Sequence, residues 1–325
     1  MKKVTTSLLG LLFLVVSCSK QDSKVALEEQ EQESIPKIAS RYCASQEVLE
    51  EQMAADPTLK IRMQKIEEFT TKFAQNPRAY RLVNGVITIP VVVHVLYKTA
   101  AENISAAQVQ SQIDVLNEDF NNTNADRTLI PAEFQDEQTT VGIKFELAEI
   151  IRKPTNKKSW TTNDAMKKSS QGGSDPVSPS SKLNMWSCNL SNGILGYAQF
   201  PGGPASTDGI VVLYAAFGRT GTLTPRFNLG RTATHEVGHY LNLRHIWGDA
   251  TCGNDQVADT PPHNTANYGC PAFPHKSTCT GNPTEMTMNY MDYTDDACMY
   301  MFSNGQNTRM KAVFAAGGPR ATLAQ

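Results

Sequence analysis

The stretch THEVGHYLNLRH contains three histidines, His235, His239 and His245. Residues four apart lie on one face of an α-helix, so His235 and His239 can bind one metal ion. A straight helix cannot present His245 to the same ion, and the chain must therefore turn after His239. Asn tolerates the left-handed conformation best among the non-glycine residues, so we predict that Asn242 has a positive φ and ends the helix.

Glu236 follows the first histidine and gives the stretch the spacing HExxH. On a helix this spacing is typical of zinc hydrolases, in which the two histidines bind zinc and the glutamate is the general base. Zinc takes three protein ligands and keeps its fourth position for a water molecule, whose pKa it lowers. A surface helix with two chance histidines is the alternative. The chain has only 6 histidines, and a third one at ligand spacing argues against chance.

The chain begins with MKKVTTSLLGLLFLVVSC, in which two lysines precede a short apolar run. The run is too short to span a membrane and is typical of a secretory signal peptide. Its end resembles the bacterial lipoprotein box, which predicts a cut after residue 17 and a lipid on Cys18. An ordinary signal peptide is the alternative. The formal net charge of -2 gives no indication of nucleic-acid binding.

The rest of the chain divides into a polar tether, a helical segment, a strand-and-helix half and an irregular half. Residues 18–35 are polar and acid-rich and are expected to be a flexible tether. Spaced apolar residues predict one or two helices over residues 44–76. The hydrophobic pattern then predicts strands at 87–97, 143–150, 182–190 and 208–218, and helices at 105–120, with Ser105 as N-cap, at 232–243 and near 304–316. We expect an active-site cleft between the two halves.

Six cysteines follow Cys18, at positions 43, 188, 252, 270, 279 and 298. Export permits disulfides, and the four cysteines from 252 to 298 are expected to staple the irregular half. The sequence alone allows three pairings of these four. Cys43 and Cys188 lie outside the cluster.

Several motifs together resemble one enzyme family. HEVGHYLNLRH resembles the extended metzincin signature HExxHxxGxxH and departs from it only at Asn242. Downstream, MNYMDYTDDAC resembles a Met-turn, with Met291 as the residue beneath the metal. The chain also contains the short motifs GYAQFP, DGIVV, VADTPP and NYMDY. All these motifs together make residues 81–320 similar to the pappalysin family of metzincin zinc metalloproteases, in its cytophagalysin and ulilysin branch.

The resemblance implies an α+β, zincin-like fold. A twisted five-stranded mixed sheet with two long helices would be followed by a smaller, irregular subdomain that disulfides staple. The implied divisions are a signal peptide at 1–17, a tether at 18–35, a helical prosegment at 36–80 and a catalytic domain at 81–320, with its two subdomains meeting near residues 241 and 242.

The resemblance also assigns roles to single residues. His235, His239 and His245 would bind zinc, and Glu236 would be the general base. Met291 would be structural. Tyr293 would help to hold the tetrahedral intermediate, and a packed core tyrosine is the alternative.

Two disulfides and a calcium site are implied for the irregular half. The pairs would be Cys252–Cys279 and Cys270–Cys298. Relatives hold calcium after the third histidine, where this chain has the oxygen-bearing residues Asp255, Asp259 and Thr260. A solvated polar loop is the alternative.

Asp296 lies where Arg-preferring relatives place a carboxylate in the pocket for the residue just after the cut. A carboxylate there would favour Arg, or less strongly Lys, at that position. The adjacent Asp295 leaves open which of the two aspartates has this role.

Cys43 lies where the prosegments of relatives carry a cysteine whose thiolate takes the fourth position of zinc, and thiolate is a good zinc ligand. A Cys43–Cys188 disulfide is the rival interpretation; we favour the switch, with Cys188 a buried free thiol. Removal of the prosegment would require a cut near residues 76–85, before Arg78 or Arg81.

These observations together predict an exported zinc endopeptidase made as a latent zymogen and acting on proteins or peptides. It would be a bacterial outer-membrane lipoprotein, touching the membrane only through a lipid on Cys18, or would be secreted after processing. Zinc hydrolysis of a non-peptide bond and a zinc-containing binding lipoprotein are the alternatives. An intact Glu236 argues against the last of these, because a binding protein does not need that carboxylate.

Overall fold

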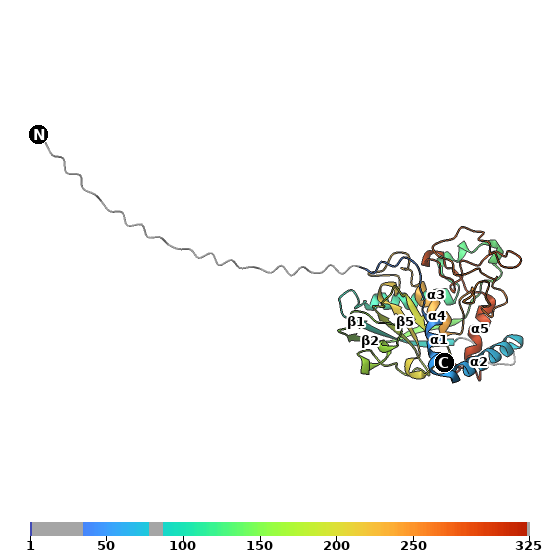
Figure 1. Cartoon of the computed structure of the whole chain (residues 1–325), viewed down its shortest axis with the longest axis horizontal. Coiled ribbons are helices and arrows are strands. Elements are labelled where there is room, and N and C mark those ends of the chain that lie inside the picture. Colours follow the sequence, from blue (N-terminus) through green and yellow to red (C-terminus); the bar gives the residue numbers. More distant parts are fainter. Residues whose placement is uncertain (2–34, 78–86, 324–325) are drawn as a thin grey trace. The chain divides into compact units, whose positions relative to one another are not determined.

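The computed structural model describes Met1, residues 35–77 and residues 87–323 of the 325-residue chain. Its core is a five-stranded sheet with the strand order β2-β1-β3-β5-β4 (Figure 1). The strands are β1 Ile87–Tyr97, β2 Ile143–Pro154, β3 Leu183–Cys188, β4 Gly196–Ala198 and β5 Ile210–Leu213. The sheet is mixed, because β4 pairs antiparallel with β5 while every other pairing is parallel.

The continuously apolar strand β1 lies in the interior of the sheet. β1 is central and pairs with both β2 and β3, and its residues Val91 to Leu96 are buried. A parallel strand covered on both faces reads as a continuous apolar run, as β1 does. The short edge strand β4 is absent from the strand predictions, since three residues give too little periodicity to detect.

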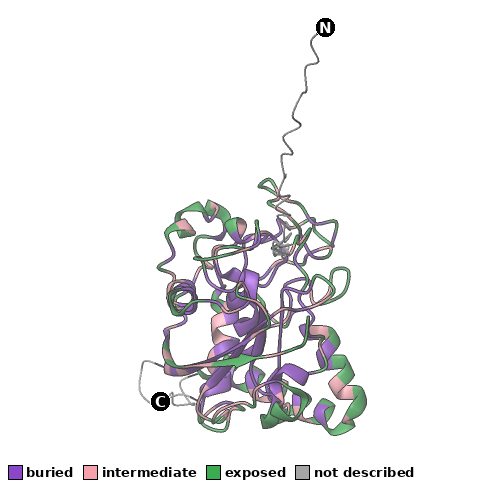
Figure 2. Cartoon of the chain, turned by 90° about the vertical axis from the view of Figure 1, so that its left-hand side faces the viewer, coloured by how far each residue is buried: buried purple, intermediate pink, exposed green. Residues whose placement is uncertain are grey.

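Two helices of the strand-and-helix half pack beside the sheet and meet each other. α3 is Ala106–Phe120, and Ser105 caps it by accepting a hydrogen bond from Gln108 N, as predicted. α4 is Arg231–Tyr240 and is buried along its whole length. Buried residues, purple in Figure 2, fill the interior of the domain around these elements. The carboxylate of Asp119 in α3 accepts a hydrogen bond from Thr234 of α4, which fixes the two helices to each other.

The segment before the sheet forms two helices, where the sequence predicts one or two. α1 is Ser45–Ala55 and α2 is Pro57–Gln75. α2 packs against α5, which is Asn304–Phe314 near the end of the chain. The apolar cluster beneath α1 and α2 contains Leu49, Leu59, Met63, Ile66 and Phe200. Glu67 of α2 also pairs with Arg309 of α5 at 2.7 Å, so an apolar surface and an ion pair both hold this segment.

The histidine helix α4 ends at Tyr240, before the predicted end at residue 243, and a left-handed turn follows it. Asn242 has φ of 72°, as predicted. Leu243 N donates to Gly238 O at 2.9 Å, and Asn242 N donates to His239 O at 2.9 Å. These two bonds form a Schellman motif, which satisfies the last carbonyls of the helix while the chain reverses.

The half after α4 is irregular and covalently cross-linked. The disulfides are Cys252–Cys279 and Cys270–Cys298, the pairs that the resemblance implies. Cys43 and Cys188 are both free and buried, so the rival disulfide between them does not form. Within the described residues, no helix is both long and apolar enough to cross a membrane.

Substitutions at Asn242 test the turn. Gly adopts a positive φ without strain, so Asn242→Gly is expected to leave the midpoint of thermal unfolding unchanged or higher. Asn242→Val is expected to lower it, because the left-handed conformation costs an ordinary residue roughly 1–2 kcal/mol. Calorimetry of both variants measures the difference. A valine variant as stable as the wild type would contradict this account of the turn.

Candidate metal centre

Three histidine nitrogens converge on one point between α4 and the chain that follows it. Nε2 of His239 lies 3.2 Å from Nε2 of His235 and 3.1 Å from Nε2 of His245. All three side chains are buried. A tetrahedral zinc ion with Zn–N bonds of about 2.0–2.1 Å separates its nitrogen ligands by roughly 3.3 Å. Both measured distances are close to the spacing that zinc requires.

The other ring nitrogen of each histidine, Nδ1, is bound to an oxygen of the protein. The partners are Tyr290 O at 2.7 Å for His235, Leu243 O at 2.8 Å for His239, and the Asp249 carboxylate at 2.5 Å for His245. A neutral imidazole that donates from Nδ1 presents a lone pair at Nε2. Burial also holds the pKa of His235 and His239 well below the usual value. Three lone pairs then face one another, an arrangement that a cation stabilises.

The turn after α4 and the Met-turn both contribute to this ligand set. The left-handed Asn242 places Leu243 O against His239, so the same turn ends the helix and orients a ligand. Met291 is fully buried, and a Cβ on Gly238 would lie 2.4 Å from its sulfur. Glycine at 238 is therefore required for the close packing of the Met-turn beneath the helix.

Cys43 completes the group. Its Sγ and one nitrogen of each of the three histidines lie within 4.8 Å of one another, and all four residues are buried. Among the described residues, this is the one such group of three or more His, Cys, Asp or Glu side chains. Three imidazoles and one thiolate form a tetrahedral donor set of the kind that zinc prefers. These residues fit zinc.

Glu236 faces the same point and is covered by the segment around Cys43. Its Oε2 accepts hydrogen bonds from Ser45 Oγ at 2.9 Å and from Cys43 Sγ at 3.3 Å. Burial raises the pKa of the Glu236 carboxyl to about 8. A Cβ on Gly196 would lie 2.8 Å from Glu236 Oε1, so glycine in β4 makes room for this carboxylate.

The Tyr293 hydroxyl contacts the main chain of Cys43. It donates to Cys43 O at 2.9 Å and accepts from Cys43 N at 3.3 Å. Its ring lies 4.9 Å from that of His245 and 4.7 Å from that of Trp247. Tyr293 thus contacts a peptide carbonyl next to the histidines, although it is also well packed.

The segment around Cys43 lies along β4 like a further strand. Cys43 and Gly196 form a parallel bridge, in which Ala44 N donates to Gly196 O at 3.1 Å and Leu195 N donates to Tyr42 O at 2.9 Å. Ala198 N donates to the Ser45 hydroxyl at 2.8 Å. An edge strand with unpaired main-chain groups is a site for binding an extended peptide.

Two residues before Cys43, Arg41 enters a buried pocket that ends at Asp296. Its Nη2 lies 2.6 Å from Asp296 Oδ1, and both side chains are almost fully buried. The other donors of the guanidinium reach Thr294 O at 3.1 Å and Thr232 Oγ1 at 3.3 Å. The ring of Phe227 lies 5.2 Å from the guanidinium carbon. The pocket matches the shape and the charge of an arginine side chain.

The neighbouring aspartate has a different partner. Asp295 pairs with Arg226 at 2.7 Å near the surface. The two aspartates therefore face different arginines, and Asp296 is the one inside the buried pocket.

The residues expected to bind calcium are only partly brought together. Asp255 accepts hydrogen bonds from Thr260 Oγ1 at 2.8 Å and Val257 N at 3.1 Å. Asp259 instead accepts from Ser303 Oγ and Gly305 N, both at 2.7 Å, at the start of α5. Asp255 and Thr260 thus contact each other, while Asp259 stabilises a helix terminus.

Sequence reasoning missed three residues of this site and one strand. Arg41 and Ser45 are ordinary polar residues whose partners are distant in sequence. Asp249 could have been found, because a carboxylate four residues after His245 is well placed to accept from its ring. The residues of β4 lie in GYAQFP, a motif that contributes to the family resemblance but was not predicted to be a strand. The predictions for Cys18, Arg78 and Arg81 lie outside the described residues.

Comparison with known proteins gives a consistent answer. Residues 182–315 match the Peptidase_M43 family model, described as pregnancy-associated plasma protein-A. An extracellular metalloprotease of Arthroderma otae is 33% identical over 261 residues, which cover 77% of this chain and 86% of the relative. One of Coccidioides posadasii is 32% identical over 249 residues, covering 73% and 80%.

Two solved structures from Tannerella forsythia are similar over most of their length. Mature mirolysin in complex with a cleaved peptide has a TM-score of 0.72 and 44% identity, and covers 74% of this chain and 96% of its own. A mutant of promirolysin has a TM-score of 0.78 and 40% identity, and covers 87% and 97%. With the histidine site, the fold and these relatives in agreement, the chain belongs to the pappalysin family of metalloproteases.

Proposed function

We propose that this protein is a zinc endopeptidase made as a latent zymogen, with residues 36–80 as prosegment and residues 81–320 as catalytic domain. The observation that carries the proposal is the course of one short segment across the site. Arg41 pairs with Asp296, Cys43 joins the three histidines, and Ser45 binds Glu236. The solved pro-form of mirolysin covers a larger share of this chain than the mature form, 87% against 74%, which also favours a zymogen.

The roles of the catalytic residues follow from their positions. A zinc ion held by His235, His239 and His245 would supply positive charge that lowers the pKa of a water molecule toward 7. Glu236 takes a proton from the attacking water and returns it to the leaving amine. Tyr293 donates to the carbonyl oxygen as negative charge develops there, as it donates to Cys43 O in the zymogen.

The pocket at Asp296 is organised for arginine before a substrate arrives. Asp296 Oδ2 accepts from Leu229 N at 2.8 Å and Arg231 N at 3.3 Å, which fixes the carboxylate. Its Oδ1 faces the Arg41 guanidinium and becomes available when that segment leaves. Lysine has one nitrogen and cannot reach Asp296, Thr232 and Thr294 together. We therefore propose Arg, and less strongly Lys, just after the cut.

The direction of the prosegment explains how it occupies the site without being a substrate. In a substrate with arginine just after the cut, the reacting carbonyl precedes the arginine in the chain. In the prosegment the residue in the arginine pocket, Arg41, precedes Cys43 at the histidines. The prosegment thus runs opposite to such a substrate and presents a thiol where the substrate would present its carbonyl.

An unbiased peptide mixture tests the activity and its general base. Processed enzyme is expected to produce cuts before Arg, and Glu236→Ala is expected to lose them while it retains zinc, since alanine removes only the proton acceptor. Mass spectrometry identifies the cuts, and elemental analysis measures the zinc. Cleavage that persists in Glu236→Ala with zinc bound would refute the mechanism.

The same assay separates the pocket from the mechanism through a matched pair of variants. Asp296→Asn is expected to cut with at least tenfold weaker preference for Arg, because a buried charge-assisted pair contributes on the order of 1.5–3 kcal/mol. Asp295→Asn is the control and is expected to keep the preference. No cuts by any processed variant would favour a non-peptide substrate or a binding role.

Cys43 is expected to control latency. Cys43→Ala removes the thiol from the histidine group, so full-length protein should process itself several-fold faster than the wild type in reducing buffer. Cys188→Ala, the other buried free cysteine, is the control and should leave the rate unchanged. Gel analysis of the time course gives the rates. Equal rates for Cys43→Ala and the wild type would remove the switch from this proposal.

Calcium remains part of the proposal for the irregular half. Burial raises the pKa of the Asp255 carboxyl to about 6, and a bound cation would offset the cost of keeping this carboxylate charged. A calcium-selective chelator, with zinc replenished, is expected to lower the midpoint of thermal unfolding, and added calcium to restore it. An unchanged midpoint would exclude a stabilising calcium ion.

Export and the lipid anchor are also proposals. The metalloproteases of Arthroderma otae and Coccidioides posadasii to which the chain is similar are named extracellular. If Cys18 carries lipid, a cut near residues 76–85 would free the catalytic domain and leave the anchor on the prosegment. Fatty-acid labelling that Cys18→Ser does not abolish would argue against this anchor.

A further inference from the structure

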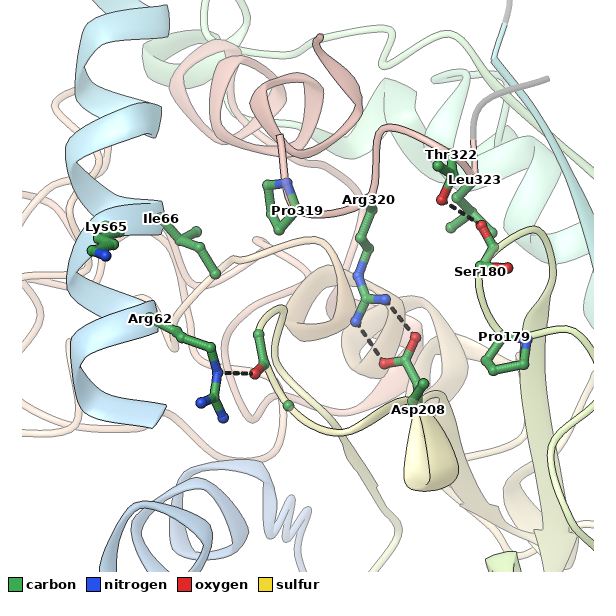
Figure 3. A pocket seen from close by; sticks show the side chains of 13 residues that line it. Arg62, Lys65, Ile66, Pro179, Ser180, Asp208, Pro319, Arg320, Thr322 and Leu323 are labelled. Atoms are coloured by element: carbon green, nitrogen blue, oxygen red, sulfur yellow. Dashed lines mark hydrogen bonds and ion pairs between the residues drawn. The ribbon is translucent and has the colours of Figure 1, made fainter. Parts of the chain in front are cut away.

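Arg320 lies near the end of the chain, after α5, and its side chain turns into the interior. The Arg320 side chain is 7% exposed, and its guanidinium pairs with Asp208, with Nη1 2.6 Å from Oδ2 and Nη2 2.9 Å from Oδ1 (Figure 3). A bidentate pair of this kind has a fixed geometry, so the position of Arg320 is well determined.

The remaining contacts of Arg320 join two parts of the active site. Its Nε donates to Tyr240 O at 2.8 Å, at the last residue of α4. Its Nη2 donates to Gln199 O at 3.3 Å, at the residue after β4. The guanidinium carbon also lies 3.4 Å from the centre of the Tyr240 ring. The Arg320 side chain thus binds both the last residue of α4 and the residue that follows the edge strand β4.

The edge strand needs such an anchor because it is short. β4 has three residues, and it pairs with β5 on one side while it binds the prosegment on the other. Its Gly196 lies against Glu236 of α4, as the close approach of a Cβ at this position shows. A shift of β4 relative to α4 would therefore displace a bound peptide main chain relative to the general base.

We propose that Arg320 is a positioning residue for peptide hydrolysis, which holds β4 at a fixed distance from α4 so that a peptide on β4 reaches the metal centre in register. The inference rests on the proposed function. It assigns a role in substrate binding to the C-terminal tail, which lies outside the histidine, Met-turn and prosegment motifs.

A cavity beside Arg320 makes an informative experiment possible. The cavity has a volume of about 470 Å³ and lies between α2 and the part of the chain that follows the proposed prosegment. Arg62, Lys65 and Ile66 line its α2 side (Figure 3). These three residues belong to the proposed prosegment, so processing opens the cavity further. Small cations added to the processed enzyme can reach the place of the Arg320 guanidinium.

The test compares processed wild type, Arg320→Ala and Arg219→Ala on a fluorogenic peptide with one internal arginine. Arg219 forms a surface pair with Glu118 and is the control for loss of an arginine. In Arg320→Ala the KM is expected to rise on the order of tenfold, because main-chain binding on β4 is weakened, and kcat is expected to fall as well, because the peptide is displaced relative to Glu236. Arg219→Ala should match the wild type.

Chemical rescue distinguishes positioning from general damage to the fold. Millimolar guanidinium chloride is expected to lower the KM of Arg320→Ala by at least threefold, whereas equal sodium chloride is not. A KM within twofold of the wild type, or a raised KM that guanidinium does not lower, would overturn the proposal.

A conservative variant covers the case in which Arg320→Ala does not fold. Arg320→Lys keeps a positive charge near Asp208 but cannot also bind Tyr240 O and Gln199 O, so the same rise in KM is expected. A lysine variant with wild-type KM would overturn the proposal. A wild type that cleaves no peptide would instead refute the proposed function.

Discussion

The convergence of three buried imidazoles on one point is the constraint on which the rest of the structure depends. Their nitrogens lie 3.1 and 3.2 Å apart in the interior, and burial lowers the pKa of His235 and His239. Such an arrangement is stable only if each ring is held in one orientation. The acceptors for Nδ1 come from three places: the Met-turn, the left-handed turn and Asp249. The irregular half of the protein thus supplies the acceptors that hold the three histidine rings in orientation.

The proposed latency involves the same groups that the proposed mechanism uses. Glu236, Tyr293, Asp296 and the edge strand all contact residues 41–45 through hydrogen bonds or an ion pair. Because these contacts involve the residues to which we assign catalytic and binding roles, the proposed latency needs no distortion of the site. The prosegment helices add an independent attachment through the Phe200 cluster and the Glu67–Arg309 pair. The pairing of residues 41–45 and the packing of α2 therefore stabilise the zymogen at separate places.

Much of this architecture could be predicted from sequence because its signals are local. Helical spacing located His235 and His239, and the tolerance of asparagine for positive φ located the turn at Asn242. The pairing of the four clustered cysteines came from family resemblance, since spacing left three possibilities open. Arg41, Ser45 and Arg320 could not be found in this way. Their partners are distant in the chain, and a single arginine or serine carries no periodic signal.

The proposed prosegment also contacts both halves of the proposed catalytic domain. It pairs with β4 in the sheet half and reaches Thr294 and Asp296 in the irregular half. A segment that is synthesised before both halves and binds both adds contacts that offset part of the conformational entropy lost when they come together. It can therefore act as a folding template as well as an inhibitor. Once it is cut away, the mature enzyme would owe its persistence to a high barrier to unfolding, and its working life would be set by a rate.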